Sequence, residues 1–250
     1  VLMRQVMKKL DLDPKMYQEK TLLGVISTQK NELVTPEEFY TMASGDYRRM
    51  RMADAYQEYQ AQLRKNNAFD FDDLIMKTVE LLQNEDDVRE YYQRKFRYVL
   101  VDEYQDTNYA QHCIVLQLTR ENQKVCVVGD DAQSIYSFRG ANIENILKFT
   151  QGYKGAKLFK LEQNYRSTQT IVSAANSLIA KNSEQIRKEV FSENSQGEAI
   201  GVFQAYSDVE EGEIVANKIV QLRNREHCSC DDFAILYRTN AQSRIFEEAL

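Results

Sequence analysis

The stretch FRYVLVDEYQDTNYAQ, residues 96–111, decides how this chain is interpreted. A short apolar run, residues 98–101, ends directly at two acids, Asp102 and Glu103, and a third acid, Asp106, follows them. Short apolar runs rich in β-branched residues are typical of a buried strand. Carboxylates at the end of such a strand suit magnesium and phosphate chemistry. They also occur as plain strand-end caps, and this stretch alone leaves the two interpretations about equally open.

A second strand of the same type follows one helix later. Residues 107–122 are predicted to form the helix, and KVCVVGDD, residues 124–131, is an apolar run that ends in Gly129, Asp130 and Asp131. A strand, a helix and a strand with continuous apolar strands indicate a right-handed βαβ unit in a parallel sheet covered on both faces. Both polar ends would then lie at the carboxyl edge of the sheet, where α/β proteins bind ligands.

Around this βαβ unit the sequence divides into three parts. Residues 1–67 are predicted to be almost wholly helical, residues 68–155 carry the two strands, and residues 156–250 return to alternating strands and helices. The pattern predicts an α/β fold with two sheet-containing domains behind an N-terminal helical subdomain. In the last part we expect strands over AKLFKLEQN (156–164), AIGVFQAY (199–206) and DFAILYRT (232–239).

Two features of the helical part give specific expectations. Thr35, followed by Pro36 and then by Glu38, has the spacing of a capping box at a helix start. Residues 47–67 are predicted to form one long helix rich in Arg, Gln and Tyr. A solvated amphipathic helix is the favoured interpretation, and its arginine cluster leaves a DNA-contacting helix open as the alternative.

Composition restricts the class of protein only broadly. Hydrophobic residues make up 43% and charged residues 28% of the chain, the balance of an ordinary soluble globular protein. The net charge of −6 excludes an overall basic nucleic-acid binder but not a local basic groove. The sequence contains no run of about 18 apolar residues, which a membrane-spanning helix would need. The four cysteines form no disulfide-like framework and suit a reducing cytosol, so we expect a cytoplasmic protein without membrane contact.

Further polar residues stand at predicted strand ends. Gln133 offers an amide that would contact a terminal phosphate or a water, and Tyr136 and Phe138 precede Arg139. Aromatic side chains beside an arginine can stack bases and bind a backbone phosphate, whereas the plain alternative is a set of core aromatics.

Arg166 lies where a strand gives way to a helix. It is either a surface ion-pair residue or an arginine that reaches a phosphate on a neighbouring domain.

Three runs, in this order, resemble motifs II, III and IV of superfamily 1 DNA helicases of the UvrD/PcrA/Rep type. Two further runs match other segments of that family, and the helical start is similar to its 1B insertion. The resemblance implies truncated RecA-like parallel sheets of the P-loop NTPase type, ATP and Mg2+ as cofactors, and single-stranded DNA and duplex junctions as partners. The runs are VLVDEYQDTN (99–108), VVGDDAQSIYSFRGA (127–141), LEQNYRST (161–168), FDFDDLI (69–75) and AILYRTNAQSR (234–244).

The resemblance also implies the residues of an ATP site. Asp102 would hold magnesium, and Glu103 would be the general base that activates the attacking water. Gln133 would contact the γ-phosphate and that water. From the last part of the chain, Tyr165 would pack against the adenine, and Arg166 would be an arginine finger supplied across the cleft between the two RecA-like domains.

A DNA path is implied in the same way. Tyr136 and Phe138 would stack single-stranded bases, although the family often has Trp where Phe138 stands. Arg139 would link the DNA path to the ATP site. Arg238 and Asn240 would contact the DNA backbone or bases from the second domain.

One part of an ATP site is missing from this sequence. None of its nine glycines lies in the pattern G-x-x-x-x-G-K-[ST], whose backbone amides and lysine bind phosphates. The first residues look helical without a cap, and the last residues start a helix without a stop signal, so we expect a piece of a longer protein. We therefore expect little ATPase and no unwinding from these residues alone. The family suggests 3′–5′ movement and repair or replication partners for the full-length protein.

Other classes of function stay open at this point. A metal-dependent phosphohydrolase that uses Asp102 and Asp106 without ATP is disfavoured, because an aspartyl-phosphate enzyme needs Asp-x-Asp at the strand end. A non-enzymatic helicase-like module that only binds DNA or protein is disfavoured by the intact pattern of Glu103, Gln133 and Arg166. Within the family, a helicase–nuclease of the RecB or AddA type would carry its nuclease domain outside these residues.

Overall fold

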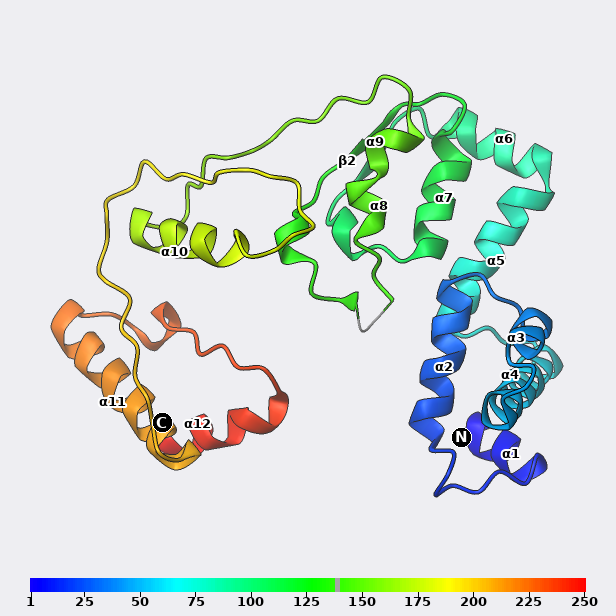
Figure 1. Ribbon diagram of the computed structural model, residues 1–250, viewed down its shortest axis with the longest axis horizontal. Helices are drawn as coiled ribbons and strands as arrows, with labels where there is room; N and C mark the ends of the chain where they lie inside the picture. The colour runs from blue at the N-terminus through cyan, green and yellow to red at the C-terminus, as the bar shows by residue number, and fades with distance from the viewer. Residues whose placement is uncertain (138–139) are drawn as a thin grey trace. The chain divides into compact units, whose positions relative to one another are not determined.

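The computed structural model of the chain describes residues 1–137 and 140–250 (Figure 1). Phe138 and Arg139, two of the predicted DNA-binding residues, lie outside the described residues. The contacts divide the chain into two compact units, and each is described by itself. Unit 1 comprises residues 1–163 and 175–190, and unit 2 comprises residues 164–174 and 191–250.

The N-terminal part is helical, as predicted. Its helices pack around one apolar core, in which Val6, Ala53 and Tyr56 have exposed fractions of 1% or less. Figure 1 shows these helices in blue and cyan. They are α1 (Leu2–Lys9), α2 (Glu19–Asn31), α3 (Pro36–Met42) and α4 (Tyr47–Lys65).

Side-chain caps explain where two of these helices begin. The Thr35 hydroxyl accepts a hydrogen bond from the Glu38 N–H at 3.2 Å, and Glu38 Oε2 accepts one from the Thr35 N–H at 2.8 Å. With Pro36 in the first turn, the predicted capping box is confirmed. At the start of α4, Asp46 Oδ1 accepts a hydrogen bond from the Arg49 N–H at 3.0 Å. Each cap satisfies a backbone donor that the helix itself leaves unpaired.

Three helices join this helical part to the sheet of unit 1. α5 packs against α2 and α7, and α6 packs against α5 and α7 (Figure 1). The Asp70 side chain accepts a hydrogen bond from the Asp73 N–H at 2.8 Å and so caps α5. The helix predicted over residues 107–122 is confirmed with shorter bounds. The three helices are α5 (Phe71–Asn84), α6 (Asp86–Lys95) and α7 (Tyr109–Thr119).

The predicted pair of parallel strands is confirmed. β1 (Val99–Val101) and β2 (Val125–Val127) pair in parallel. Beyond them, the Val128 N–H donates to the carbonyl of Val101 at 2.8 Å, and the Tyr104 N–H donates to the carbonyl of Val128 at 2.9 Å. The segment that follows β1 therefore lies against the segment that follows β2.

The prediction that this sheet is covered on both faces is wrong for the described residues. Leu100 is 77% exposed, and Cys126, its partner on β2, is exposed as well. Val99 and Val101 are partly buried. Successive strand residues point to opposite faces of a sheet. Leu100 and Cys126 therefore share one face, and the described residues leave that face largely uncovered.

Short helical segments follow each of the two strands. Tyr104, with an exposed fraction of 0%, anchors them. Its hydroxyl lies 2.5 Å from His112 Nδ1, and its ring meets the Phe149 ring edge-on at a centroid distance of 5.5 Å. The segments are η1 (Tyr104–Asp106), η2 (Asp131–Gln133), α8 (Glu144–Leu147) and α9 (Phe149–Gly152).

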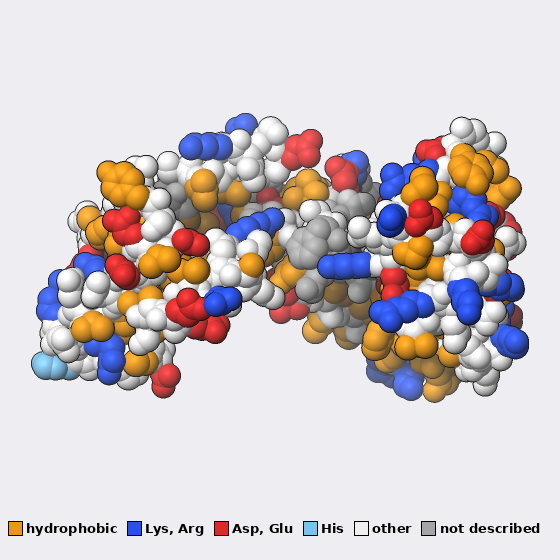
Figure 2. Space-filling model, turned by 90° about the horizontal axis from the view of Figure 1, so that it is seen from below, with side chains coloured by type: hydrophobic (Ala, Val, Ile, Leu, Met, Phe, Trp, Pro, Cys, Tyr) orange, Lys and Arg blue, Asp and Glu red, His pale blue; other side chains and the backbone are white. Residues whose placement is uncertain are grey.

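The strands predicted over residues 156–164, 199–206 and 232–239 are wrong. In the described structure these stretches contain no paired strand, and the Asn164 N–H at the end of the first donates to the carbonyl of Phe191 at 2.7 Å within unit 2. A strand needs neighbours that accept its hydrogen bonds and cover its apolar side chains. Leu236, in the last of these stretches, is 94% exposed. Figure 2 shows other hydrophobic side chains exposed among charged ones on the face in view.

Packed helices give unit 2 its compact part. A Cβ built on Gly212 of α11 would lie 3.1 Å from Ile245 Cγ2 and 3.2 Å from Ala249 Cβ of α12, so glycine allows the two helices to approach. None of the described helices is both long and apolar enough to cross a membrane. The remaining elements are α10 (Gln169–Ile179, shared by the two units), α11 (Asp208–Glu226), η4 (Cys230–Asp232), η5 (Asn240–Gln242) and α12 (Ser243–Ala249).

Candidate functional site

The chain turns sharply where β1 ends. Glu103 adopts the left-handed conformation, with φ 49° and ψ 42°. For a non-glycine residue this costs roughly 1–2 kcal/mol. Asp102 Oδ1 accepts a hydrogen bond from the Glu103 N–H at 2.9 Å, and both side chains are exposed. Such strain persists only where the surroundings stabilise it, and it clusters at functional sites. The two carboxylates that the sequence singled out therefore stand in solvent at the end of the strand.

The buried amide of Gln105 joins the ends of the two strands. Its side chain is only 1% exposed. Gln105 Nε2 donates to Glu103 Oε2 at 2.8 Å and lies 3.3 Å from Asp106 Oδ2. Gln105 Oε1 accepts a hydrogen bond from the Asp130 N–H at 3.0 Å. The residues that follow β1 and those that follow β2 thus share one hydrogen-bond network.

Gly129 makes this close approach possible. A Cβ built on Gly129 would lie 2.5 Å from Gln105 Oε1 and 2.8 Å from Ile146 Cδ1. Both distances are shorter than a van der Waals contact, so any larger residue would displace the Gln105 amide. Space, rather than an unusual backbone conformation, explains the glycine at the end of β2.

The loop after β2 carries the predicted phosphate-contacting amide. Asp130 Oδ1 accepts a hydrogen bond from the Ala132 N–H at 3.0 Å, and Asp130 Oδ2 accepts one from Gln133 Nε2 at 2.8 Å. The side chain of Gln133 is exposed. Gln133 therefore lies at the same sheet edge as Glu103 and is linked to it through Asp130 and Gln105.

Lys188 forms ion pairs with the same loop. Its Nζ lies 2.5 Å from Asp130 Oδ1 and 3.2 Å from Asp131 Oδ1. The Ile186 N–H donates to Asp131 Oδ2 at 2.8 Å. Sequence reasoning missed these contacts, and no local pattern could have found them, because more than fifty residues separate the partners.

These ion pairs change the pKa values of both partners. Burial favours the neutral carboxyl of Asp130, but the hydrogen bonds from Lys188 and Gln133 outweigh burial and lower the pKa of Asp130 below its usual range. Burial likewise disfavours the charged Lys188, but its hydrogen bonds to Asp130 and Asp131 raise the pKa of Lys188 above its usual range. The loop therefore carries charged groups at neutral pH.

A hollow lies beside the end of β1. Glu103 and Asp106 line its polar side, and Val101, Ile114 and Val115 line its apolar side. Asp106 Oδ1 is buried and has no hydrogen-bond partner in the part of the chain that the structure describes. Among those residues, no group of three or more His, Cys, Asp or Glu side chains could bind a metal ion alone. A magnesium ion here would need further oxygens from water or a bound phosphate, which is how Mg2+ is commonly bound.

Of the DNA-binding candidates in unit 1, only Tyr136 is described, and this residue is 38% exposed. Phe138 and Arg139 lie outside the described residues. Gly140 has φ +85°, and a Cβ built on it would lie 3.4 Å from Asn31 Nδ2 of α2. Gly140 therefore lies beside the last residue of α2.

Four candidates lie in unit 2. Tyr165 is 78% exposed, and Arg166 is exposed with its N–H donating to Asn164 Oδ1 at 3.0 Å. Arg238 and Asn240 are exposed in the segment that leads into α12. Within a single unit, the structure therefore brings together the candidates at the ends of β1 and β2 and not those of the last part.

A buried ion cluster connects α2 to the start of α5. Lys30 Nζ lies 2.7 Å from Asp70 Oδ2 and 2.8 Å from Asp73 Oδ1. Gln60 Nε2 also donates to Asp73 Oδ1, at 2.9 Å. The acidic start of the helix after residue 68 was visible in the sequence, but nothing there marked Lys30 as the partner of these acids.

The arginine cluster of α4 is involved in contacts within the helical part. Other residues of α4, including Ala53 and Tyr56, belong to the apolar core. These contacts favour the amphipathic interpretation of the helix over the DNA-contacting one. The contacts are Arg48 with the carbonyl of Met16, Arg49 over the ring of Phe39, and Arg51 with Asp54 and the carbonyl of Leu10.

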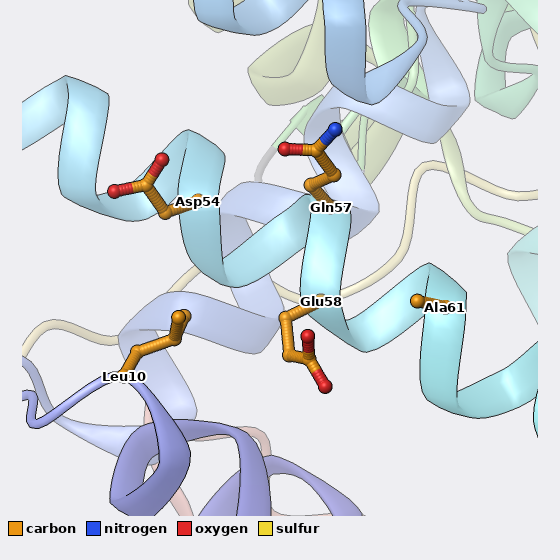
Figure 3. Close-up of a pocket in the computed structure, with 5 residues that line it drawn as sticks. All are labelled: Leu10, Asp54, Gln57, Glu58 and Ala61. Atoms are coloured by element: carbon orange, nitrogen blue, oxygen red, sulfur yellow. The ribbon is translucent and has the colours of Figure 1, made fainter.

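A shallow hollow between α4 and the segment after α1 has acidic walls (Figure 3). Both of its acids already have partners. Glu58 Oε2 accepts a hydrogen bond from Lys9 Nζ at 2.7 Å, and Glu58 Oε1 accepts one from Gln62 Nε2 at 2.7 Å. Asp54 pairs with Arg51 at 2.9 Å. These pairs explain the acids without a ligand.

Fold and site together define a class of protein. Two parallel strands end at one edge in carboxylates and an amide, and a helical part precedes them in the chain. In α/β proteins, this edge is where nucleotides and other ligands bind. The chain has the features of an α/β ligand-binding protein whose candidate site lies at the ends of β1 and β2.

Two family models match nearly the whole chain. The model of the UvrD/REP helicase N-terminal domain matches residues 1–154, and that of the UvrD-like helicase C-terminal domain matches residues 159–250. The chain therefore belongs to the UvrD-like helicase family.

Curated relatives agree with this assignment. The chain is 48% identical to the ATP-dependent DNA helicase PcrA of Bacillus subtilis (strain 168), over 100% of the chain and 34% of the relative. Identity is 45% to PcrA of Leuconostoc citreum, over 100% of the chain and 33% of the relative. It is 46% to PcrA of Staphylococcus aureus (strain COL), over 99% of the chain and 34% of the relative. The chain thus spans about a third of the length of these relatives.

Proposed function

We propose that the full-length protein is an ATP-dependent DNA helicase, and that this chain carries part of its ATP site and part of its DNA path. The observation that carries the proposal is the network at the sheet edge, in which Glu103 and Gln133 are joined through Gln105 and Asp130. The relatives named ATP-dependent DNA helicase PcrA support it. In this proposal, ATP hydrolysis drives translocation on single-stranded DNA and unwinding at duplex junctions.

The residues at the ends of β1 and β2 supply the first half of the chemistry. Asp102 would hold Mg2+, and Asp106 Oδ1, which is buried and has no hydrogen-bond partner among the described residues, would accept a hydrogen bond from water around the ion. When bound with ATP, Mg2+ neutralises charge on the phosphate oxygens. Glu103 takes a proton from the attacking water as general base, and Gln133 orients that water beside the γ-phosphate. The backbone turn at Glu103 keeps its carboxylate exposed for this role.

Two residues of unit 2 complete the proposed ATP site. Tyr165 packs against the adenine, and Arg166 stabilises the negative charge that develops during phosphoryl transfer. Both side chains are exposed in unit 2, which leaves them accessible to a nucleotide. Because one domain would supply Glu103 and the other Arg166, hydrolysis would depend on closure between the domains.

The proposed DNA path uses residues of both units. Tyr136 and Phe138 stack bases, an interaction worth roughly 1–3 kcal/mol per base and tolerant of sequence. Arg139 links the DNA path to the ATP site. Arg238 and Asn240 contact the DNA backbone or bases from unit 2. Stacking that tolerates any base suits a motor that moves along any strand.

The proposal extends to organisation and context. Residues 1–67 form a 1B-like helical subdomain, residues 68–155 belong to a first RecA-like domain, and residues 156–250 to a second. The boundary between the two family models, which falls between residues 154 and 159, supports the last division. We further propose movement in the 3′–5′ direction, repair or replication proteins as partners, and a location in the cytoplasm.

The decisive experiment is Glu103→Gln in the full-length gene product. DNA-stimulated ATPase activity is expected to fall by ~10²–10⁴-fold, the usual contribution of a general base. Binding of ATP and of single-stranded DNA should stay near the wild-type value, because the amide keeps the size of the side chain. Glu121→Gln, a change at an exposed glutamate, is the control and should leave turnover unchanged. Unchanged ATPase activity in Glu103→Gln would refute the role given to this residue.

A further inference from the structure

Gln105 is a buried polar side chain to which the proposed function gives no role. It is 1% exposed, although a glutamine is ordinarily found in solvent. Its carboxamide is bonded at both ends, to two carboxylates on the nitrogen side and to one backbone N–H on the oxygen side. A buried amide satisfied in this way fixes the geometry of whatever it contacts.

Only an amide suits this position. Glu103 and Asp106 present carboxylate oxygens, which accept hydrogen bonds, whereas the Asp130 N–H donates one. A carboxamide offers donors on its nitrogen and an acceptor on its oxygen. A carboxylate at residue 105 would place a third acid against Glu103 and Asp106, and an apolar side chain would leave all three groups without their partner.

The hydrogen bonds continue from Gln105 to Gln133, the residue proposed to contact the γ-phosphate. The N–H of Asp130 binds Gln105, and the carboxylate of the same residue accepts a hydrogen bond from Gln133 Nε2 at 2.8 Å. An unbroken chain therefore runs from Glu103 through Gln105 and Asp130 to Gln133. The backbone of Gly129 lies so close to the Gln105 amide that a Cβ built there would lie only 2.5 Å from Gln105 Oε1.

We propose that Gln105 is a positioning residue, which orients the Glu103 carboxylate and couples it to the loop that carries Gln133. This inference rests on the proposed ATPase function and assigns a further residue to it. In this role, Gln105 does not contact the nucleotide. It sets the direction of the general base relative to the loop, so that the water-activating and water-orienting groups move as one.

The test compares Gln105→Glu and Gln105→Met in the full-length gene product. Both variants keep nearly the wild-type volume, and both remove the donor to Glu103. The kcat of DNA-stimulated ATP hydrolysis should fall by about 10–100-fold, the order of loss expected for a misplaced catalytic group. The affinity for ATP, measured with a fluorescent nucleotide, should stay unchanged.

Gln93→Met is the matched control. Gln93 Nε2 donates a hydrogen bond to the carbonyl of Gln117 at 2.7 Å, and this bond joins α6 to α7. This variant should leave kcat and the affinity for ATP unchanged. Wild-type kcat in both Gln105 variants, while Glu103→Gln abolishes turnover, would overturn the inference and leave the proposed function standing. Loss of folding in both variants, seen by circular dichroism, would overturn it in favour of a structural role. An inactive wild-type protein would overturn the proposed function and the inference with it.

Discussion

Lys30 Nζ lies 2.8 Å from Asp73 Oδ1, and the side chains of both residues are 0% exposed. Asp70 adds a second carboxylate at 2.7 Å from the same ammonium group. Removing one partner of a buried ion pair leaves an uncompensated charge in the interior, and this strongly lowers the free energy of unfolding. The connection between α2 and α5 therefore depends on this lysine.

Lys30→Met should destabilise the chain strongly. We expect a loss of about 3–5 kcal/mol in the free energy of unfolding, because Asp73 would remain buried without a cation. Urea denaturation monitored by circular dichroism measures the loss. Lys20→Met changes an exposed lysine of the same helix and should have little effect. Equal stabilities of the two variants would show that the cluster contributes nothing.

Gly129→Ala should disturb the edge of the sheet. The added methyl group would meet Gln105 Oε1 at 2.5 Å, and we expect a cost of about 1–3 kcal/mol from overpacking. Gly24→Ala is the matched control, because nothing lies within 4 Å of a Cβ at that helical position. There, alanine should stabilise the helix by roughly 0.5–1 kcal/mol. Thermal unfolding of both variants gives the comparison, and a neutral Gly129→Ala would contradict the steric argument.

Lys188→Met should lower stability in a pH-dependent way. Asp130 has a lowered pKa, so its contribution is present above the unfolded value of about 3.9 and is lost as the pH falls through the folded value. Lys188 has a raised pKa, so its contribution is present below the unfolded value of about 10.4 and is lost as the pH rises through the folded value. The difference in Tm between wild type and variant should therefore be greatest between these limits and shrink as the pH falls below ~4.

Differential scanning calorimetry from acidic to neutral pH measures this difference. Lys181→Met, a change at an exposed lysine nearby in sequence, is the control and should show a small, constant difference. A Tm difference for Lys188→Met that stays constant down to the lowest pH would argue against the ion pairs with Asp130 and Asp131.

The 250-residue chain on its own should hydrolyse little ATP. It contains Glu103 and Gln133 but no G-x-x-x-x-G-K-[ST] pattern to bind the phosphates. Phosphate release measured with Mg2+, with and without single-stranded DNA, checks this expectation against the full-length gene product. Clear magnesium-dependent, DNA-stimulated activity from the chain alone would contradict it.

Much of the candidate site was visible in the sequence, because its signals are local. Asp102 and Glu103 follow an apolar run directly, and Gln133 follows the next run of the same kind. Parallel pairing then brings the two polar ends to one edge without further information. The contacts of Gln105 and Lys188 were not predictable in this way. Gln105 bonds to a residue 25 positions away, and Lys188 to residues 57 and 58 positions away.

The sequence by itself determined the helical start, the capping box at Thr35, the two strands and the order of the motifs, because spacing along the chain sets all of them. Tertiary structure decided which side chains meet. It paired Lys30 with Asp73 and placed Gln105 between Glu103 and Asp130. It also left the apolar runs of the last part unpaired, because a strand forms only where a neighbouring strand supplies its hydrogen bonds and a packed layer covers its side chains.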